Sequence, residues 1–237
     1  MNARMHWVAW LLGAAALVSG CALDNVGSNY SLQEKGDTGI LVAALGRAGA
    51  IEFDMNAVVR SVGGGRTYTI IVDNSTVQKD FGQVVIPPAH SEASDWGYVP
   101  AAAPLERLVV VPMRAGEYEI STVNGQAPRF KGSSASPFSI VSDRLGLRFS
   151  VRPGQITYLG SIVFGFPDWL ATSHPHGPLR VLTADTRERD AKLFNERYPN
   201  LGGNLPERTL SDGPYSSPNL RYYLFVSPEG GDSRGGM

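Results

Sequence analysis

Two histidines separated by one residue are the strongest candidates for metal chemistry in this chain of 237 residues. His174 and His176 flank a proline, and Asp168 lies six residues before the first of them. In an extended segment, side chains two residues apart point to the same side, so both imidazoles could bind one ion. A zinc site needs three or four ligands in fixed geometry, and Asp168 is no clear third. We favour a solvated surface loop and keep a metal site at these three residues as the alternative.

The residue types of a hydrolytic site are scarce. A serine hydrolase needs a nucleophile in a strained turn, a histidine base and an acid, but no Gly-x-Ser-x-Gly motif occurs. After residue 20, His90 is the one histidine besides the pair, and the 22 acidic residues show no spacing that selects two for glycoside hydrolysis. The sequence therefore predicts no catalytic residue and no cofactor. A hydrolase or metal-dependent enzyme that uses the loop with His174 and His176 is the alternative.

Aromatic residues stand beside acids in two short stretches, residues 95–98 (DWGY) and 166–169 (FPDW). Tryptophan and tyrosine provide a large contact area at a low cost in side-chain entropy. Trp96, Tyr98 and Trp169 are therefore candidate contacts for a partner protein or a glycan. The alternative is that these loops pack as lids over the ends of the folded domain.

Composition excludes several classes of protein. The formal charge is -1 and the pI is about 6.4, so the chain lacks the basic surface that nucleic-acid binding requires. Apolar residues make up 43% and charged residues 18%, which is typical of a globular domain. The single cysteine excludes an intrachain disulfide and a zinc site of the multi-cysteine kind.

The first 20 residues have the three parts of an export signal. Arg4 supplies positive charge, residues 7–17 are an apolar stretch of 11 residues, and residues 18–20 (VSG) have small side chains. A helix needs about 20 apolar residues to cross a bilayer core of ~30 Å, so this stretch is too short for a stable span. We therefore expect residues 1–20 to be a signal peptide that is removed before Cys21.

Residues 17–21 (LVSGC) resemble a bacterial lipobox. In proteins with this motif, the cysteine sulfur receives a diacylglycerol and the new amino group is often acylated, palmitate being a usual chain. Acyl chains contribute ~0.8 kcal/mol per buried methylene, so two or three of them anchor a protein durably. The resemblance implies a membrane-anchored lipoprotein lipidated on Cys21. Because no Asp follows the cysteine, it also implies the outer membrane, facing the periplasm; a plain secretory signal with a coincidental cysteine is the alternative.

Short apolar or alternating segments predict strands at residues 40–45, 67–72, 108–113, 117–121, 147–152, 156–164 and 220–226. Tyr118 and Ile120 should share a buried face, while residues 63–65, three glycines, predict a turn. The segment 156–164 is apolar on both faces and should be a central strand covered on both sides. Its two expected faces are Ile156, Tyr158, Ile162 and Phe164 on one side, and Leu159 and Val163 on the other.

One helix is expected near residues 186–198. Asp185 and Glu188 have the spacing of a capping box, and Phe194 and Tyr198 recur at helical spacing before a proline. Many short strands and one late helix predict an all-β fold, an antiparallel β-sandwich with one C-terminal accessory helix. We expect one such domain over residues 38–230, joined to the lipid by a flexible tether over residues 21–37, which are polar and lack periodicity.

Residues 116–120 (GEYEI) and 149–160 (FSVRPGQITYLG) resemble uncharacterised bacterial envelope lipoproteins. Those proteins carry a β-sandwich like the prealbumin or carboxypeptidase-regulatory modules, and the similarity covers roughly residues 105–205. The family implies a fold and a location but no reaction and no catalytic residues. With no catalytic constellation in the chain, we expect a non-catalytic binding or structural module of the cell envelope.

Overall fold

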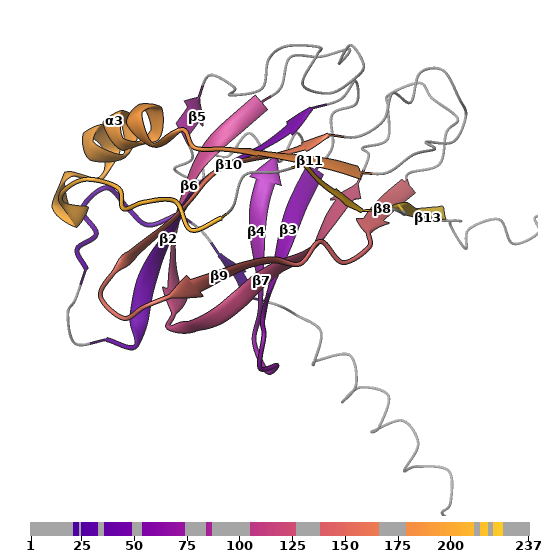
Figure 1. Cartoon of the computed structure of the whole chain (residues 1–237), viewed down its shortest axis with the longest axis horizontal. Coiled ribbons are helices and arrows are strands. Elements are labelled where there is room, and N and C mark those ends of the chain that lie inside the picture. The colour runs from indigo at the N-terminus through magenta and orange to yellow at the C-terminus, as the bar shows by residue number, and fades with distance from the viewer. Residues whose placement is uncertain are drawn as a thin grey trace, which may run out of the picture.

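The structure, a computed structural model, describes residues 21–23, 25–32, 36–48, 54–73, 84–86, 105–126, 138–165, 179–210, 214–217 and 220–224. This part of the chain consists mainly of strands, with one α-helix near its C-terminal end (Figure 1). The elements are β1 Cys21–Leu23, β2 Thr38–Ala48, β3 Asp54–Ser61, β4 Thr67–Asp73, β5 Val84–Ile86, β6 Leu105–Arg114, β7 Gly116–Gln126, β8 Phe138–Ser142, β9 Leu147–Val151, β10 Ile156–Gly165, β11 Leu179–Ala184, α3 Arg187–Arg197, the 3-10 turn η1 Pro199–Leu201, β12 Pro214–Ser217 and β13 Leu220–Leu224. The predicted all-β fold with a C-terminal helix is confirmed.

The described strands form two sheets that face each other. Sheet A has the order β1-β4-β3-β7-β8-β13, with β9 also paired to β7, and sheet B has the order β12-β11-β10-β2-β6-β5. Most neighbours are antiparallel, but β2 with β10 and β1 with β4 are parallel pairs. Parallel neighbours require a crossover, and β2 and β10 are joined through most of the strands of sheet A. The long pairing of β2 with β10 therefore depends on the whole sandwich.

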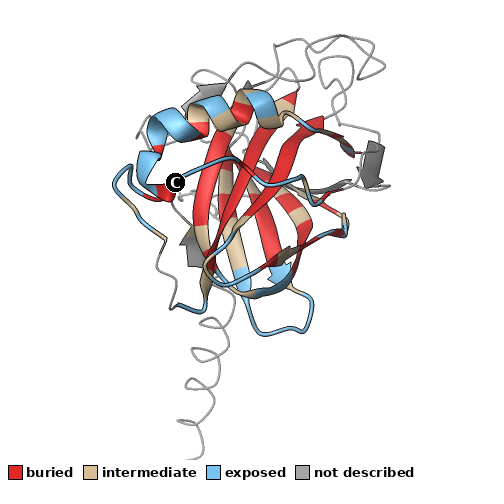
Figure 2. Cartoon of the chain, turned by 60° about the vertical axis from the view of Figure 1, so that its left-hand side comes forward, coloured by how far each residue is buried: buried red, intermediate tan, exposed pale blue. Residues whose placement is uncertain are grey.

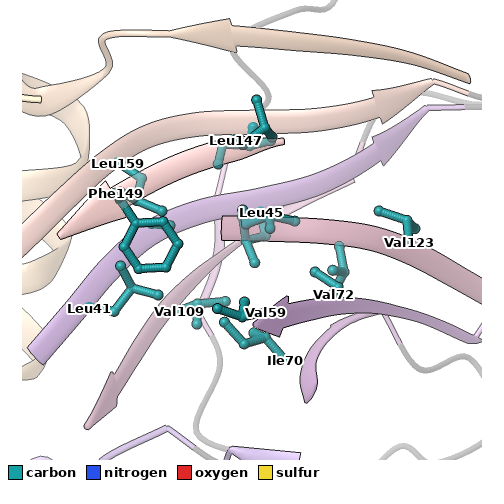
Figure 3. Close-up of a cluster of buried hydrophobic side chains, with 14 of the residues drawn as sticks. Leu41, Leu45, Val59, Ile70, Val72, Val109, Val123, Leu147, Phe149 and Leu159 are labelled. Atoms are coloured by element: carbon teal, nitrogen blue, oxygen red, sulfur yellow. The ribbon is translucent and has the colours of Figure 1, made fainter. Parts of the chain in front are cut away.

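The main hydrophobic core lies between the two sheets. Leu41 and Val109 of sheet B meet Val59 and Phe149 of sheet A in one buried cluster (Figure 3). The alternation predicted for residues 147–152 is confirmed, because β9 buries every second side chain. A strand with one face toward a core and one toward solvent shows this period in its sequence.

Strand β7, which pairs with β9 in sheet A, shows the same alternation of inward and outward side chains. Tyr118 and Ile120 are almost completely buried in the main core, as predicted. The glutamates between and beside them point to the outer face of sheet A. There Glu119 accepts a 2.6 Å hydrogen bond from Arg144 Nη2, and this contact raises the pKa of Arg144.

A second core covers the outer face of sheet B. Phe194 and Tyr198 from the end of helix α3 pack on Val42, Val110 and Tyr158 from three neighbouring strands. Figure 2 shows the result: the strands beneath the helix are buried, while the outward side of α3 is exposed. Sheet B is thus enclosed between sheet A and the helix layer. The prediction that residues 156–164 form a central strand covered on both faces is confirmed.

The predicted faces of β10 are wrong in its second half. Its register with β2 shifts between Tyr158 and Ser161, where Gly160 adopts a positive φ of 81°. Tyr158 faces the helix layer, but beyond this bulge Ile162 and Phe164 face sheet A instead. An extra residue in one strand exchanges the two faces of everything that follows, and a period of two in the sequence does not reveal it.

Helix α3 begins one residue later than the predicted capping box implies. Thr186 is the N-cap, and Asp185 Oδ1 instead accepts a 3.0 Å hydrogen bond from the backbone N–H of Arg187. The Thr186 hydroxyl does not cap the helix, because it donates to the carboxylate of Asp190 at 2.7 Å. A buried acid one turn into the helix therefore takes the threonine away from the usual capping role.

Residues 21–37, for which we expected a flexible tether, contact both sheets where the structure describes them. β1 pairs with β4 at the edge of sheet A. Asn25 and Val26 then lie against β6 of sheet B, where the Val26 N–H donates to the carbonyl of Val110 at 2.9 Å. Tyr30 packs against the second core. Pairing of this kind uses main-chain groups, so a short polar segment can form it without hydrophobic periodicity.

We expect Asn25→Ala to lower the free energy of unfolding by about 1–3 kcal/mol, because it leaves partly buried main-chain groups unpaired. The Asn25 side chain accepts a 2.9 Å hydrogen bond from the N–H of Val110 and donates one of 3.2 Å to the carbonyl of Leu108. Urea unfolding of the purified domain measures the change. Asn29 is exposed in the same segment, so Asn29→Ala serves as the control and should change stability by less than about 0.5 kcal/mol. Equal effects of both substitutions would show that these two hydrogen bonds, which we call the clasp around Asn25, do not stabilise the fold.

Candidate functional site

Cys21, the predicted lipidation residue, is the first residue of β1. Its backbone pairs in parallel with Tyr68 of β4, and Leu23 pairs with Ile70. Because the two strands run in the same direction, the N-terminal end of β1 lies toward the start of β4 and its preceding turn. A group attached to Cys21 would therefore emerge at this end of sheet A, with no free linker between it and the sheet.

Buried charged residues gather in one place under helix α3. Arg189 Nη2 donates to Glu106 Oε2 at 3.0 Å, and Arg189 Nε donates to Asp190 Oδ1 at 2.7 Å. Ser161 Oγ donates to the same oxygen of Glu106 at 2.8 Å. The group joins strands β6 and β10 of sheet B to the first turn of α3. We call it the α3 network; its members are Glu106, Tyr158, Ser161, Thr186, Arg189 and Asp190.

Asp190 is the second anion of the α3 network. Its Oδ2 accepts hydrogen bonds from the Tyr158 hydroxyl and from the Thr186 hydroxyl, both at 2.7 Å. Arg189 occupies the other carboxylate oxygen and also reaches Thr186 Oγ1 at 3.2 Å. Two buried carboxylates are therefore served by one guanidinium and three hydroxyl groups. The planar guanidinium suits this arrangement, because its donors point in fixed directions toward several acceptors.

The electrostatics of the network keep its donors protonated. Burial lowers the pKa of Arg189, but the hydrogen bond with Asp190 and the charge of Glu106 outweigh burial and raise it. Burial also raises the pKa of the Tyr158 phenol far above its usual value, and the charge of Asp190 adds to the rise although the hydrogen bond with Thr186 opposes it. Tyr158 is thus a neutral donor at any physiological pH.

A serine beside a glutamate and a tyrosine beside an aspartate could suggest acid–base chemistry. These side chains are, however, shielded from solvent. Glu106, Tyr158, Ser161 and Asp190 are all 0% exposed, and 23% of the Arg189 side chain is exposed. A general base must lie within hydrogen-bond reach of a substrate, and no substrate reaches these groups. The α3 network is therefore a structural device that fixes the helix on sheet B.

Sequence reasoning missed the α3 network, although one signal was present. Glu106 has the same strand parity as Leu108 and Val110, so an acid was placed on a face that should be apolar. Its cation lies 83 residues later in the chain, and spacing could not identify it. Ser161 was also hidden, because it joins this face only through the bulge at Gly160.

The other predicted site residues lie outside the described residues. These are Asp168, His174 and His176 for metal, and Trp96, Tyr98 and Trp169 for partner contacts. The metal site and the contact loops therefore stay predictions. Within the described ranges, no three His, Cys, Asp or Glu residues are grouped so that they could hold a metal ion.

No helix in the described part of the chain combines the length and hydrophobicity needed to span a membrane. Comparisons with protein-family models, with characterised proteins and with solved structures found no match. The resemblance to envelope lipoproteins accordingly stays a prediction made from residues 17–21 and 105–205 of this sequence.

Proposed function

We propose that this chain is a lipid-anchored protein of the bacterial cell envelope, held at the outer membrane on its periplasmic side by acyl chains on Cys21. The β-sandwich serves as a rigid, non-catalytic module that binds or positions another envelope component. The lipobox-like residues 17–21 motivate the anchor. The single observation that carries the rest is the pairing of β1 with β4, which joins the proposed anchor directly to the sandwich.

A direct junction has a mechanical consequence. Acyl chains on a flexible tether would hold a domain near a membrane at any orientation and at variable distance. Here β1 is fixed to sheet A, and the next residues are fixed to β6 of sheet B by Asn25 and Val26. The sandwich would then stand close to the bilayer in one orientation, presenting its opposite end to the periplasm. A scaffold with a defined direction benefits from this arrangement, while a diffusing enzyme has no need of it.

The burial of the α3 network supports a non-catalytic role for the described part. Its hydroxyl and carboxylate groups bind one another and Arg189 instead of lining an open surface. The three layers, sheet A, sheet B and helix α3, are each tied to the next by an apolar core. The described part is thus organised for rigidity.

The anchor is tested by expressing the full chain and a Cys21→Ala variant in a bacterial host fed with labelled palmitate. We expect the label in the unchanged chain only, together with a mature mass that corresponds to Cys21 as the first residue plus its acyl chains. The variant should lack label and remain uncut or soluble, because its sole thiol is gone. Ser28→Ala, an exposed site in the same segment, controls for effects of substitution itself. Unlabelled protein that still carries residues 1–20 would contradict the anchor.

A further inference from the structure

The turn between β3 and β4 projects from the end of the sandwich where Cys21 lies. Residues 60–66, which we call the hairpin tip, close this hairpin: the Ser61 N–H donates to the carbonyl of Arg66 at 3.0 Å. The tip extends from the lower end of the molecule in Figure 1. Cys21 is level with Tyr68, and Val62 lies about three residue levels beyond it, past the start of β4 at Thr67. At 3.3 Å per extended residue this is at most about 10 Å.

The exposed side chains of the hairpin tip suit a phospholipid surface. Val62 is 46% exposed and is the single large hydrophobic residue exposed in the described part of the chain. Residues 63–65 are glycines, which add no polar side chain and no bulk. Arg60 and Arg66 are exposed on either side, and the tip contains no acid. An isolated exposed valine is unremarkable on a soluble protein, so its position at the same end of sheet A as Cys21 is what gives it meaning.

We propose that the hairpin tip is a second membrane contact, in which Val62 enters the leaflet that holds the acyl chains and the two arginines bind lipid phosphates. The inference rests on the proposed lipid anchor at Cys21. The polar layer on each side of a bilayer is about 5–8 Å thick, so a tip reaching up to about 10 Å past the anchored residue can pass through it. Guanidinium groups bind phosphate through paired hydrogen bonds and remain at the polar layer while the valine goes deeper.

The same geometry favours a bilayer over another protein as the surface that the hairpin tip contacts. A bilayer that holds acyl chains on Cys21 would lie at the end of sheet A from which the tip projects, because β1 and the hairpin are neighbours in one sheet. Glu117 of β7 is the nearest exposed acid by register, since its carbonyl accepts from the Val62 N–H at 2.9 Å. Its carboxylate accepts from the Ser150 hydroxyl, and Arg66 also interacts with the Tyr118 hydroxyl, so this end of the sheet carries two exposed arginines and one exposed glutamate.

Site-specific labelling tests this contact in the lipidated full chain. The native thiol would be consumed by the lipid, so Val62→Cys introduces one free thiol that takes an environment-sensitive fluorophore. Glu196→Cys, exposed on α3, is the matched control. Both proteins are reconstituted through their own acyl chains into vesicles of phosphatidylethanolamine and phosphatidylglycerol. We expect the label at position 62 to emit at shorter wavelength and to lose emission when the lipids carry nitroxides, while the label at position 196 remains in water.

The possible failures are distinguishable. Mass spectrometry of the same samples reports the acyl chains, and unmodified cysteine at position 21 would overturn the proposed anchor together with this contact. Acylated protein whose label at position 62 behaves like that at position 196 would overturn the membrane contact alone. A label that is shielded in intact cells but stays in water in vesicles would also overturn it, because a protein or the cell wall would then cover the tip.

Discussion

Arg189→Ala should lower the free energy of unfolding by about 3–5 kcal/mol, the usual cost of removing one partner from a buried ion pair. Arg189 is the one cation bound to both Glu106 and Asp190 in the contacts described above, and both carboxylates are 0% exposed. Without it, both buried carboxylates would lose their hydrogen bonds with the guanidinium, and a buried charge that loses such contacts is costly. Urea unfolding followed by tryptophan fluorescence and circular dichroism measures the loss.

Arg187→Ala is the matched control for Arg189→Ala. Arg187 belongs to the same turn of α3, but its ion pair with Asp185 spans 4.0 Å and both side chains are more than 40% exposed. An exposed pair contributes at most about 1 kcal/mol, so this variant should unfold nearly as the unchanged protein does. A loss of similar size in both variants would mean that the burial of the charges does not explain the effect of Arg189→Ala, since helix propensity favours alanine in both.

Removing all charges of the network at once separates charge burial from packing. Arg189→Met combined with Glu106→Gln and Asp190→Asn should be more stable than Arg189→Met alone, because no uncompensated anion is left buried. If the triple variant is the less stable of the two, the network contributes mainly through its hydrogen-bond geometry.

The strands of this fold could be predicted where one face is apolar and the other polar. β9 has three inward and two outward residues, and β7 places Tyr118 and Ile120 inward while Glu117 and Glu119 alternate with them. Strand β3 was missed, although Met55, Ala57 and Val59 share its inward face. The adjacent Val58 breaks the alternation, since it is also largely buried, on the outer face.

The candidate sites were less predictable than the strands. The proposed lipidation of Cys21 comes from a local motif of a few consecutive residues. The α3 network depends on partners far apart in the chain, and the clasp around Asn25 depends on main-chain pairing. Neither leaves a periodic trace in the sequence. A motif of consecutive residues can therefore suggest a site from the sequence, while contacts that only the folded chain makes cannot be predicted from it.

The bulge at Gly160 is the feature by which one strand serves two cores. Before it, Tyr158 reaches the α3 network; after it, Phe164 fills the space between the sheets. Both the backbone angle and the surroundings require glycine. Its φ is 81°, and an added Cβ would lie 2.4 Å from the carbonyl oxygen of Ala184 on the paired strand β11. Straightening the bulge to relieve that contact would turn Phe164 toward the wrong face.

Gly160→Ala should therefore cost about 3–5 kcal/mol of unfolding free energy, combining strain at positive φ with overpacking. Gly203 is the matched control, since its φ is 89° and nothing lies within 4 Å of a Cβ built there. Gly203→Ala should cost only the conformational part, about 1–2 kcal/mol. The difference between the two variants in urea unfolding measures the steric part at β11. Equal losses of unfolding free energy would show that β10 and β11 can accommodate the added methyl group. The bulge would then not be needed to hold the two cores in place.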